Sequence, residues 1–349
     1  MTATERVLAA LAYQPVDRIP LFDSYWGEFV AAWQQQKRLG PDVDINDYYG
    51  IDIAICTPDE TPWPSQAATL ERTPAGEVAR DGWGATHRTT PGSFFYEEVA
   101  VALPEKVDPD TLVFESPHAE GRYDGYLAAV AHARAKGRCV FAKTGGPYLR
   151  TMNLRGVEQW LIDLAEDPGW AYALAERVTD HLTAVGVEAL RRAGLGETGI
   201  WIYDDIASNR GLMVSPRTYE RIFAPLMARM VSAYRAAGAR HVALHSDGNV
   251  LPVLDLLVDL GIDTLNPVEP KAGLDVVALR EQYAGRLAFV GGLDNAGVLP
   301  SGDRARIRAH VQRCAEAARR GGIVIGSHSI GPDIAVADYD YAIELIRGA

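Results

Sequence analysis

From residue 139 to the end of the chain, short apolar runs alternate with longer amphipathic runs, and this alternation most restricts the fold. Such a rhythm is typical of parallel β-α units. The strand candidates are residues 139–144, 199–204, 241–246, 263–267, 287–292 and 323–328. The helix candidates lie near residues 154–165, 168–193, 215–237, 250–260, 275–284 and 303–320. The second half therefore predicts a parallel sheet covered by helices.

The first half supplies two more strand candidates, residues 18–23 and 52–57, which brings the total to eight. Eight parallel strands with intervening helices close most naturally into a (β/α)8 TIM barrel, an α/β fold. We expect residues 1–349 to form a single catalytic barrel domain. Residues 67–103 interrupt the rhythm with Gly turns and short alternating runs. They predict two or three antiparallel strands, inserted as a flap at the C-terminal mouth of the barrel.

Bulk composition excludes several classes of protein. The net charge is −12 and no basic block is present, which argues against a nucleic-acid partner. No apolar run approaches the roughly 20 residues that span a bilayer, so no membrane association is expected. The first 18 residues place charges among their apolar residues and predict an amphipathic helix rather than a signal peptide. Three widely spaced cysteines suit a reducing compartment, so we expect a cytoplasmic protein.

Polar residues stand where the predicted strands end, which is where catalytic groups lie in TIM barrels. They are Asp59, Asp204, Asp205, His245, Asp247, Asn266, Glu269, Asp294 and His328. Alternate residues of a strand face the same side, so His245 and Asp247 are expected to face one cavity. Adjacent residues face opposite ways, and of the pair Asp204 and Asp205 we expect Asp205 to point into the site. Charged groups gathered at one mouth of an apolar barrel must be paired or bind something.

Four of these residues, His245, Asp247, Glu269 and His328, predict a divalent metal site. Imidazole nitrogens and carboxylate oxygens suit Zn²⁺, Mn²⁺ or Fe²⁺, and we take zinc as the first choice. A catalytic ion keeps one position open, so either Glu269 or Asp247 is expected to stand outside direct contact with it. The alternative is a hydrogen-bonded polar cluster that binds a small-molecule substrate directly.

Aromatic residues near the predicted mouth are candidates for substrate contact. Tyr25 and Trp26 follow the first strand, and with Phe29 and Trp33 they form either an aromatic wall or a helix face that packs on the barrel. The run Gly145–Tyr148 follows the third strand, and we interpret it as a tight turn that carries Tyr148 into the cavity. Asn266 and Met152 are further substrate-binding candidates.

Long segments of the chain resemble the uroporphyrinogen decarboxylase-like superfamily, and the resemblance covers nearly the whole sequence. It rests on ATERVLAALAYQPVDRIPL near the start, on YDDIASNRGLMVSPRTYERIFAPLMARM, and on GGIVIGSHSIGPDIAVADYDYAI near the end. Residues 245–295 carry the most specific part. The superfamily includes uroporphyrinogen decarboxylase, corrinoid-dependent methyltransferases and the C-terminal barrel of cobalamin-independent methionine synthase.

The methyltransferase branch implies a zinc site held by a His-x-Cys pair and a later Cys, with an added Glu in the methionine synthases. This chain matches the His at His245 and the Glu at Glu269, whereas Asp247 replaces the first Cys and His328 stands at or near the last one. Thiolates suit thiol activation, and harder ligands do not. The resemblance therefore implies demethylation of a small methoxy- or methylamine-type substrate, with transfer to a corrinoid on a separate carrier protein. A homodimer is a further expectation from the family.

The decarboxylase branch implies a different chemistry, and the chain departs from it. The N-terminal Arg motif that grips porphyrinogen carboxylates is absent, and Met152 stands near the position of a family Tyr, with Tyr148 close by. We therefore expect no turnover of uroporphyrinogen. A lyase that uses Asp59 and His328 on a small carboxylated aromatic or heterocyclic substrate stays open as the alternative. A binding protein without catalysis is a third hypothesis, against which the polar mouth argues.

Overall fold

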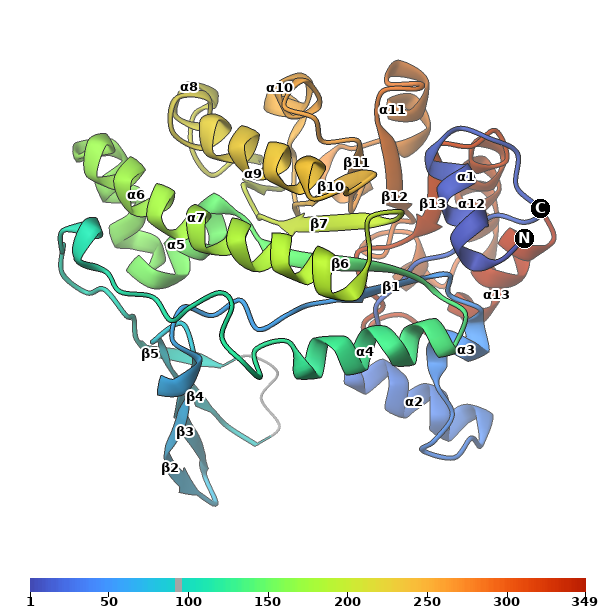
Figure 1. The fold of residues 1–349 in the computed structure, drawn as a ribbon. Helices are drawn as coiled ribbons and strands as arrows, with labels where there is room; N and C mark the ends of the chain where they lie inside the picture. The colour runs from blue at the N-terminus through green and yellow to red at the C-terminus, as the bar shows by residue number, and fades with distance from the viewer. Residues whose placement is uncertain (92–95) are drawn as a thin grey trace.

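Seven parallel strands form the central sheet of the protein (Figure 1). The computed structural model describes residues 1–91 and 96–349. In spatial order the strands are β1 (Ile53–Cys56), β6 (Cys139–Gly145), β7 (Gly199–Tyr203), β10 (His241–His245), β11 (Thr264–Asn266), β12 (Ala288–Gly292) and β13 (Ile323–Gly326). Each neighbouring pair is parallel. The strands predicted from residue 139 onward are all present, with ends shifted by up to two residues.

The first predicted strand, residues 18–23, closes the ring without forming a regular strand. Leu21 makes an isolated parallel bridge with Ile325 of β13. On its other side the carbonyl of Leu21 accepts a hydrogen bond of 2.9 Å from the amide of Asp52, just before β1. The segment therefore fills the gap between the last strand and the first. The chain forms the predicted TIM barrel.

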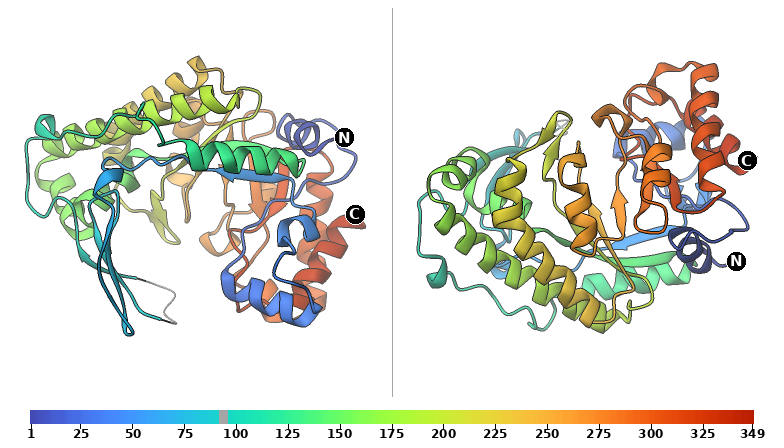
Figure 2. Two further views of the ribbon diagram at one scale, coloured as in Figure 1. Left: turned by 60° about the horizontal axis from the view of Figure 1, so that its bottom comes forward. Right: turned by 90° about the horizontal axis from the view of Figure 1, so that it is seen from above.

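Helices surround this sheet on its outer side (Figures 1 and 2). The α-helices are α1 (Ala3–Leu11), α2 (Gly27–Lys37), α3 (Ile45–Tyr49), α4 (Asp124–Ala135), α5 (Pro147–Arg155), α6 (Val157–Glu166), α7 (Pro168–Ala193), α8 (Pro216–Thr218), α9 (Ala224–Ala236), α10 (Leu254–Asp259), α11 (Val276–Gln282), α12 (Arg304–Ala318) and α13 (Val336–Arg347). The short 3-10 turns are η1 (Pro64–Gln66), η2 (Pro109–Thr111), η4 (Leu251–Val253), η5 (Pro270–Ala272) and η6 (Leu299–Ser301), and η3 (Tyr219–Phe223) is a π-turn that joins α8 to α9. Among these described helices, none combines the length and the apolar character needed to cross a bilayer.

The helix predicted near 154–165 is present as α6, but it begins later than predicted. The segment near 154–165 contains parts of two helices, because Gly156 adopts a φ of 85° between α5 and α6. That left-handed backbone is open to glycine and strained for other residues. The predicted helix at 168–193 is confirmed as α7.

The inside of the barrel divides into two layers. Its lower layer is an apolar cluster that α1 covers from below, and we call it the floor. The floor consists of Val7, Ala10, Leu11, Ile53, Cys139, Phe141, Trp201, Ala243, Ala288, Val290 and Val324. Strand alternation explains its membership, since residues two apart on one strand share a side. On β6, β7 and β10 the next inward positions toward the strand ends carry polar groups, those of Lys143, Tyr203 and His245.

The predicted insertion is confirmed as an antiparallel sheet, but it has four strands rather than two or three. They are β2 (Ala68–Thr73), β3 (Gly76–Arg80), β4 (Thr86–Thr89) and β5 (Glu97–Ala100). We call this sheet the arm, and it projects away from the barrel (Figures 1 and 2). At its base, the Arg150 guanidinium lies 5.2 Å from the ring centre of Trp83, near the end of β6. Residues 92–95 of the predicted insertion lie outside the described residues. A two-stranded hairpin, β8 (Ala207–Ser208) with β9 (Gly211–Leu212), follows β7.

Candidate metal centre and its cavity

A cavity of about 570 Å³ opens where the barrel strands end. Its walls include Lys143 of β6, Tyr203 of β7, His245 of β10, Asn266 of β11 and His328 just after β13. Those of these lining residues that belong to strands point into the barrel, and they lie closer to the C-terminal strand ends than the floor does. The cavity is therefore the polar continuation of the apolar barrel interior.

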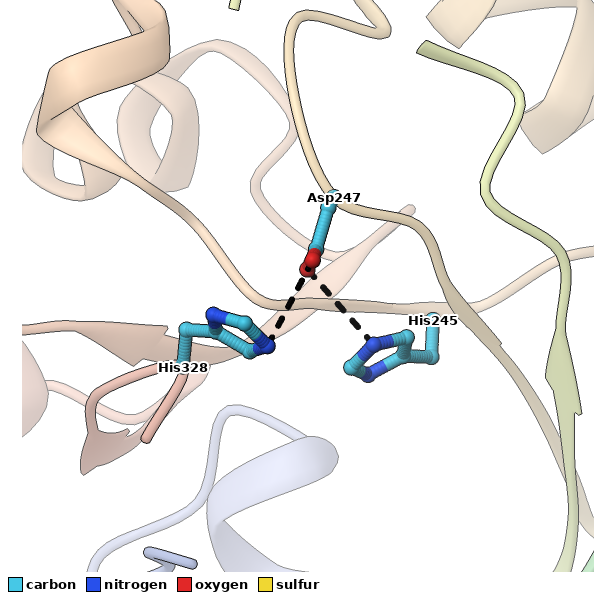
Figure 3. A group of neighbouring side chains, drawn as sticks. All are labelled: His245, Asp247 and His328. Atoms are coloured by element: carbon cyan, nitrogen blue, oxygen red, sulfur yellow. Dashed lines mark ion pairs between the residues drawn. The ribbon is translucent and has the colours of Figure 1, made fainter. Parts of the chain in front are cut away.

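Three predicted ligands converge at this mouth. His245, Asp247 and His328 each offer one ligand atom, and these atoms all lie within 4.8 Å of one another. His245 Nε2 lies 3.6 Å from Asp247 Oδ1, and His328 Nε2 lies 3.4 Å from Asp247 Oδ2. Figure 3 shows the two imidazole rings on either side of the carboxylate, both turned toward it.

Asn266 determines which nitrogen of His245 is free. Its Nδ2 donates a hydrogen bond of 2.9 Å to the carbonyl of Val290, which turns Oδ1 toward the histidine. Oδ1 lies 2.6 Å from His245 Nδ1, so this nitrogen must carry the proton and donate it. His245 Nε2 is then left with a lone pair that faces Asp247, as metal-ligating histidines require.

Two carboxylates hold the backbone around Asp247. Asp205 Oδ1 accepts a hydrogen bond of 3.0 Å from the amide of Asp247. Glu269 Oε2 accepts one of 3.0 Å from the amide of Gly248, and its Oε1 lies 3.8 Å from His328 Nδ1. Glu269 thus stands beside the three-residue group and outside it, one of the two positions expected for it.

Burial shapes the electrostatics of the group. It lowers the pKa of His245 to about 4, which keeps the imidazole neutral. It also raises the pKa of Asp247 to about 6, with His328 opposing the shift and the carboxylates of Asp205 and Glu269 adding to it. A buried carboxylate with two further carboxylates nearby and a neutral imidazole beside it is a poor arrangement for structural stability alone.

The three residues pass a simple test of fit for a metal ion. His245 Nε2 and Asp247 Oδ1 are buried and have no hydrogen-bond partner among the described residues. Ligands bound at about 2.1 Å in a tetrahedron lie about 3.4 Å apart. His245 Nε2 lies 3.6 Å from Asp247 Oδ1 and His328 Nε2 lies 3.4 Å from Asp247 Oδ2, so each imidazole stands about one such edge from a different oxygen of the same carboxylate. Two histidines and one carboxylate also leave a coordination position open.

The cavity holds polar residues that the sequence analysis did not single out. Lys143 is half-buried, and its Nζ lies 4.2 Å from the ring centre of Tyr203. Tyr203 in turn lies 4.6 Å, centre to centre, from the ring of His245. Asp23 is buried in the cavity wall and accepts hydrogen bonds from Ser327 and Tyr339. Strand alternation could have placed Lys143 in the barrel interior, because Cys139 and Phe141 face inward on the same strand.

Asp59 and Tyr148 were predicted as site residues, and both lie away from this cavity. Asp59 is exposed, and its Oδ1 accepts hydrogen bonds from the amide and hydroxyl of Thr61. Tyr148 was expected to enter the cavity from a tight turn. Instead, Pro147 begins α5, and the Tyr148 ring is buried against Phe223 with 5.4 Å between ring centres. Both predictions were wrong because a loop or a helix start, not a strand, carries these residues.

The other three substrate candidates have mixed surroundings. Met152, on α5, packs against the outer core between helices and strands and does not line the cavity. Trp26 Nε1 donates a hydrogen bond of 3.0 Å to Ser329 Oγ, beside the strand end that carries His328. Tyr25 lines the cavity and also stacks on Phe29. Tyr25 therefore fulfils both expected roles, since it packs against a helix and also forms part of the cavity wall.

The adjacent aspartates face opposite ways. Asp204 is fully buried, and it accepts hydrogen bonds from the amides of Tyr148 and Leu149 at the start of α5. Asp205 faces the mouth, where it holds Asp247. Asp204 therefore binds the backbone at the start of α5 and does not face the mouth.

Comparison with known proteins identifies the family. The family model for uroporphyrinogen decarboxylase (URO-D) matches residues 99–349. A methyltransferase from Methanosarcina mazei has the same fold, with a TM-score of 0.71 and 19% identity over 100% of this chain and 98% of that chain. No curated protein sequence matches the chain.

Two more distant structures are similar only in part. One is described as a vitamin-B12 independent methionine synthase from Listeria monocytogenes, with a TM-score of 0.41 and 12% identity over 95% of this chain and 94% of that one. The other is an endo-1,4-beta-xylanase from Penicillium canescens, with a TM-score of 0.40 and 12% identity over 68% and 80%. Neither score supports an inference about function. The family match spans most of the chain, which therefore belongs to the uroporphyrinogen decarboxylase (URO-D) family.

Proposed function

We propose that this protein is a metal-dependent methyltransferase that demethylates a small methoxy- or methylamine-type substrate. The methyl acceptor in this proposal is a corrinoid on a separate carrier protein. The observation that carries it is the convergence of His245, Asp247 and His328 at the barrel mouth. Membership of the URO-D family and the barrel shared with a methyltransferase support it.

The residues present suit a divalent ion, with zinc as the first choice and Fe²⁺ and Mn²⁺ as alternatives. His245, Asp247 and His328 would hold it, and when bound it would supply Lewis acidity toward the heteroatom that carries the methyl group. No thiolate is among the three ligands, so activation of a thiol substrate is not expected.

The chain's own groups prepare the site for this chemistry. Asn266 keeps His245 in the tautomer that presents Nε2, and Asp205 and Glu269 hold the backbone of Asp247 and Gly248. In the proposed reaction the carbon–oxygen or carbon–nitrogen bond breaks, and the methyl group passes to the acceptor. The electron pair stays on the heteroatom, which takes up a proton.

The lyase alternative has less support from the geometry. It places Asp59 and His328 together as catalytic groups, whereas the Asp59 carboxylate binds Thr61 of its own loop. It remains a distinct outcome of the experiments below.

The metal step is tested with His245→Ala and with His132→Ala as the control, because His132 is exposed on α4. Elemental analysis after incubation with zinc should find stoichiometric metal in the wild type and the control. His245→Ala should lose it and stay folded, as circular dichroism would report. Zinc retained undiminished by His245→Ala would contradict the assigned ligand.

The reaction itself is tested with methoxybenzenes and methylamines, with cob(I)alamin supplied as acceptor. We expect alcohol or amine product from the wild type and none from His245→Ala. Release of CO₂ from an aromatic acid by metal-free protein, without methyl transfer, would replace the methyltransferase by the lyase.

A further inference from the structure

Lys143 occupies an unusual position for a lysine. It is the inward residue of β6 that follows Cys139 and Phe141, both members of the floor. Its side chain lines the same cavity as His245, Asn266 and His328. An ammonium group held in a barrel interior costs free energy unless an opposite charge accompanies it.

The protein does not supply that opposite charge at close range. In the chain as described, outside residues 92–95, no carboxylate oxygen forms an ion pair with Lys143 within 4 Å, and its Nζ rests over the Tyr203 ring instead. Burial lowers the pKa of Lys143, and the nearby Arg150 guanidinium adds to this effect while Glu60 and Asp205 oppose it. The other cation in the cavity wall, Arg138, is already paired with Asp44 and Asp47.

Tyr203 connects this cation to the metal centre. Its ring lies 4.2 Å from Lys143 Nζ and 4.6 Å from the centre of the His245 ring. A molecule about the size of one substituted ring can therefore reach Lys143 with one end and the metal ligands with the other. Asp205, Asp247 and Glu269 surround the metal end and would repel an anion there.

The chemistry around Lys143 favours a carboxylate over a phosphate. Phosphate sites typically use free amides at a helix start. The helix that begins beside β6 is α5, and its amides at Tyr148 and Leu149 already donate to the buried carboxylate of Asp204. With those amides occupied, Lys143 offers a single charged donor, which is enough for one carboxylate but leaves the further oxygens of a phosphate without donors.

We propose that Lys143 binds a carboxylate of the substrate, so that the protein acts on small organic acids whose reacting end lies at His245, Asp247 and His328. The identity of the reacting end rests on the proposed function, whereas the recognition of the carboxylate does not. In this arrangement the aromatic or aliphatic body of the acid lies along the Tyr203 ring.

Calorimetric titration with benzoate and with benzyl alcohol, its uncharged counterpart, tests the carboxylate contact. The wild type should bind benzoate about 10- to 100-fold more tightly, the range expected for a charge-assisted hydrogen bond. Lys143→Met should lose this preference, and Lys143→Arg should retain part of it. Lys136→Met is the matched control, because Lys136 is exposed before β6, and it should behave as the wild type.

Equal benzoate affinity in the wild type and Lys143→Met would overturn the proposal, as would a wild type without preference for benzoate. Zinc content measured on Lys143→Met should equal that of the wild type, which shows that the variant is folded at its metal end.

Methyl release from 4-methoxybenzoate separates this inference from the proposed function. If benzoate preference depends on Lys143 but no methoxy acid is demethylated, the carboxylate contact stands and the methyltransferase proposal fails. If Lys143→Met demethylates 4-methoxybenzoate with wild-type kcat/KM, the methyltransferase stands and the carboxylate contact fails.

Discussion

The floor and the mouth of the barrel are built from the same strands, yet their chemistry is opposite. A step of two residues along a strand leads from one to the other: Phe141 to Lys143, Trp201 to Tyr203, and Ala243 to His245. The floor is an apolar cluster of buried side chains, whereas the mouth carries ionisable side chains such as His245 and Lys143. The packed core and the proposed binding chemistry are therefore separated by position along a strand, not by domain.

The largest expected effect comes from breaking the floor. Trp201 is 2% exposed and packs on Phe22 and Phe141 at ring-centre distances of 5.4 and 6.2 Å. Trp201→Ala should lower the free energy of unfolding by about 3–5 kcal/mol, because the surrounding barrel cannot close the cavity. Urea denaturation measures this loss. If the folded variant also lost its zinc, floor and mouth would not be separable.

A buried carboxylate at the strand ends allows a test by pH. Burial raises the pKa of Asp204 to about 7 from an ordinary value of 3.8. An acid with a higher pKa in the folded chain stabilises it fully below its unfolded pKa, and this contribution is lost as the pH rises through the folded value. From about pH 4 to about pH 8 the wild type should lose up to about 4 kcal/mol relative to Asp204→Asn.

Chemical denaturation of both proteins across that pH range provides the comparison. The Asn side chain keeps one oxygen that can accept from the amide of Leu149, the shorter of the two hydrogen bonds at 2.7 Å, whereas the amide of Tyr148 loses its acceptor. If the free energies of unfolding of the two proteins changed with pH in parallel, ionisation of the Asp204 carboxylate in the folded state would carry no free-energy cost.

Much of the barrel was predictable because its strands are buried on both faces and its helices are amphipathic. The alternation that predicted His245 and Asp247 on one side applies equally to Lys143 and Tyr203. Lys143 and Tyr203 each lie one residue before the end of a predicted strand, so a search among the last residues of the strands does not find them. Strand 18–23 was harder to define, since it joins its neighbours through few backbone hydrogen bonds.

The errors concern residues outside strands. Asp59 lies in a loop where no periodicity determines direction, and its neighbour Glu60 is the buried one. Tyr148 was assigned to a turn although Pro147 precedes it, and proline favours the first position of a helix. Metal ligation by Glu269 could not be judged from spacing, because the amide of Gly248 competes for its carboxylate.

A smaller effect is expected from loosening the mouth without touching a ligand. Asn266→Ala removes the acceptor that holds His245 Nδ1–H. Zinc affinity, measured by competition with a chelator, should fall about 10- to 100-fold, as is typical when the partner of a ligating histidine is lost. Asn266→Asp keeps an acceptor at this position and should recover most of the affinity. Unchanged affinity in Asn266→Ala would mean that the tautomer is determined elsewhere.

The smallest effect should come from Tyr25, which belongs to both the packing around the barrel and the cavity wall. Its hydroxyl lies 2.8 Å from that of Tyr339, which donates to the buried Asp23. Tyr25→Phe keeps the ring against Phe29 and removes one hydrogen bond, so the free energy of unfolding should fall by about 1 kcal/mol. Benzoate affinity should stay within about twofold of the wild type if only the ring meets the substrate. A large loss of benzoate binding with unchanged stability would instead assign the Tyr25 hydroxyl to substrate recognition and extend the functional mouth to the first strand.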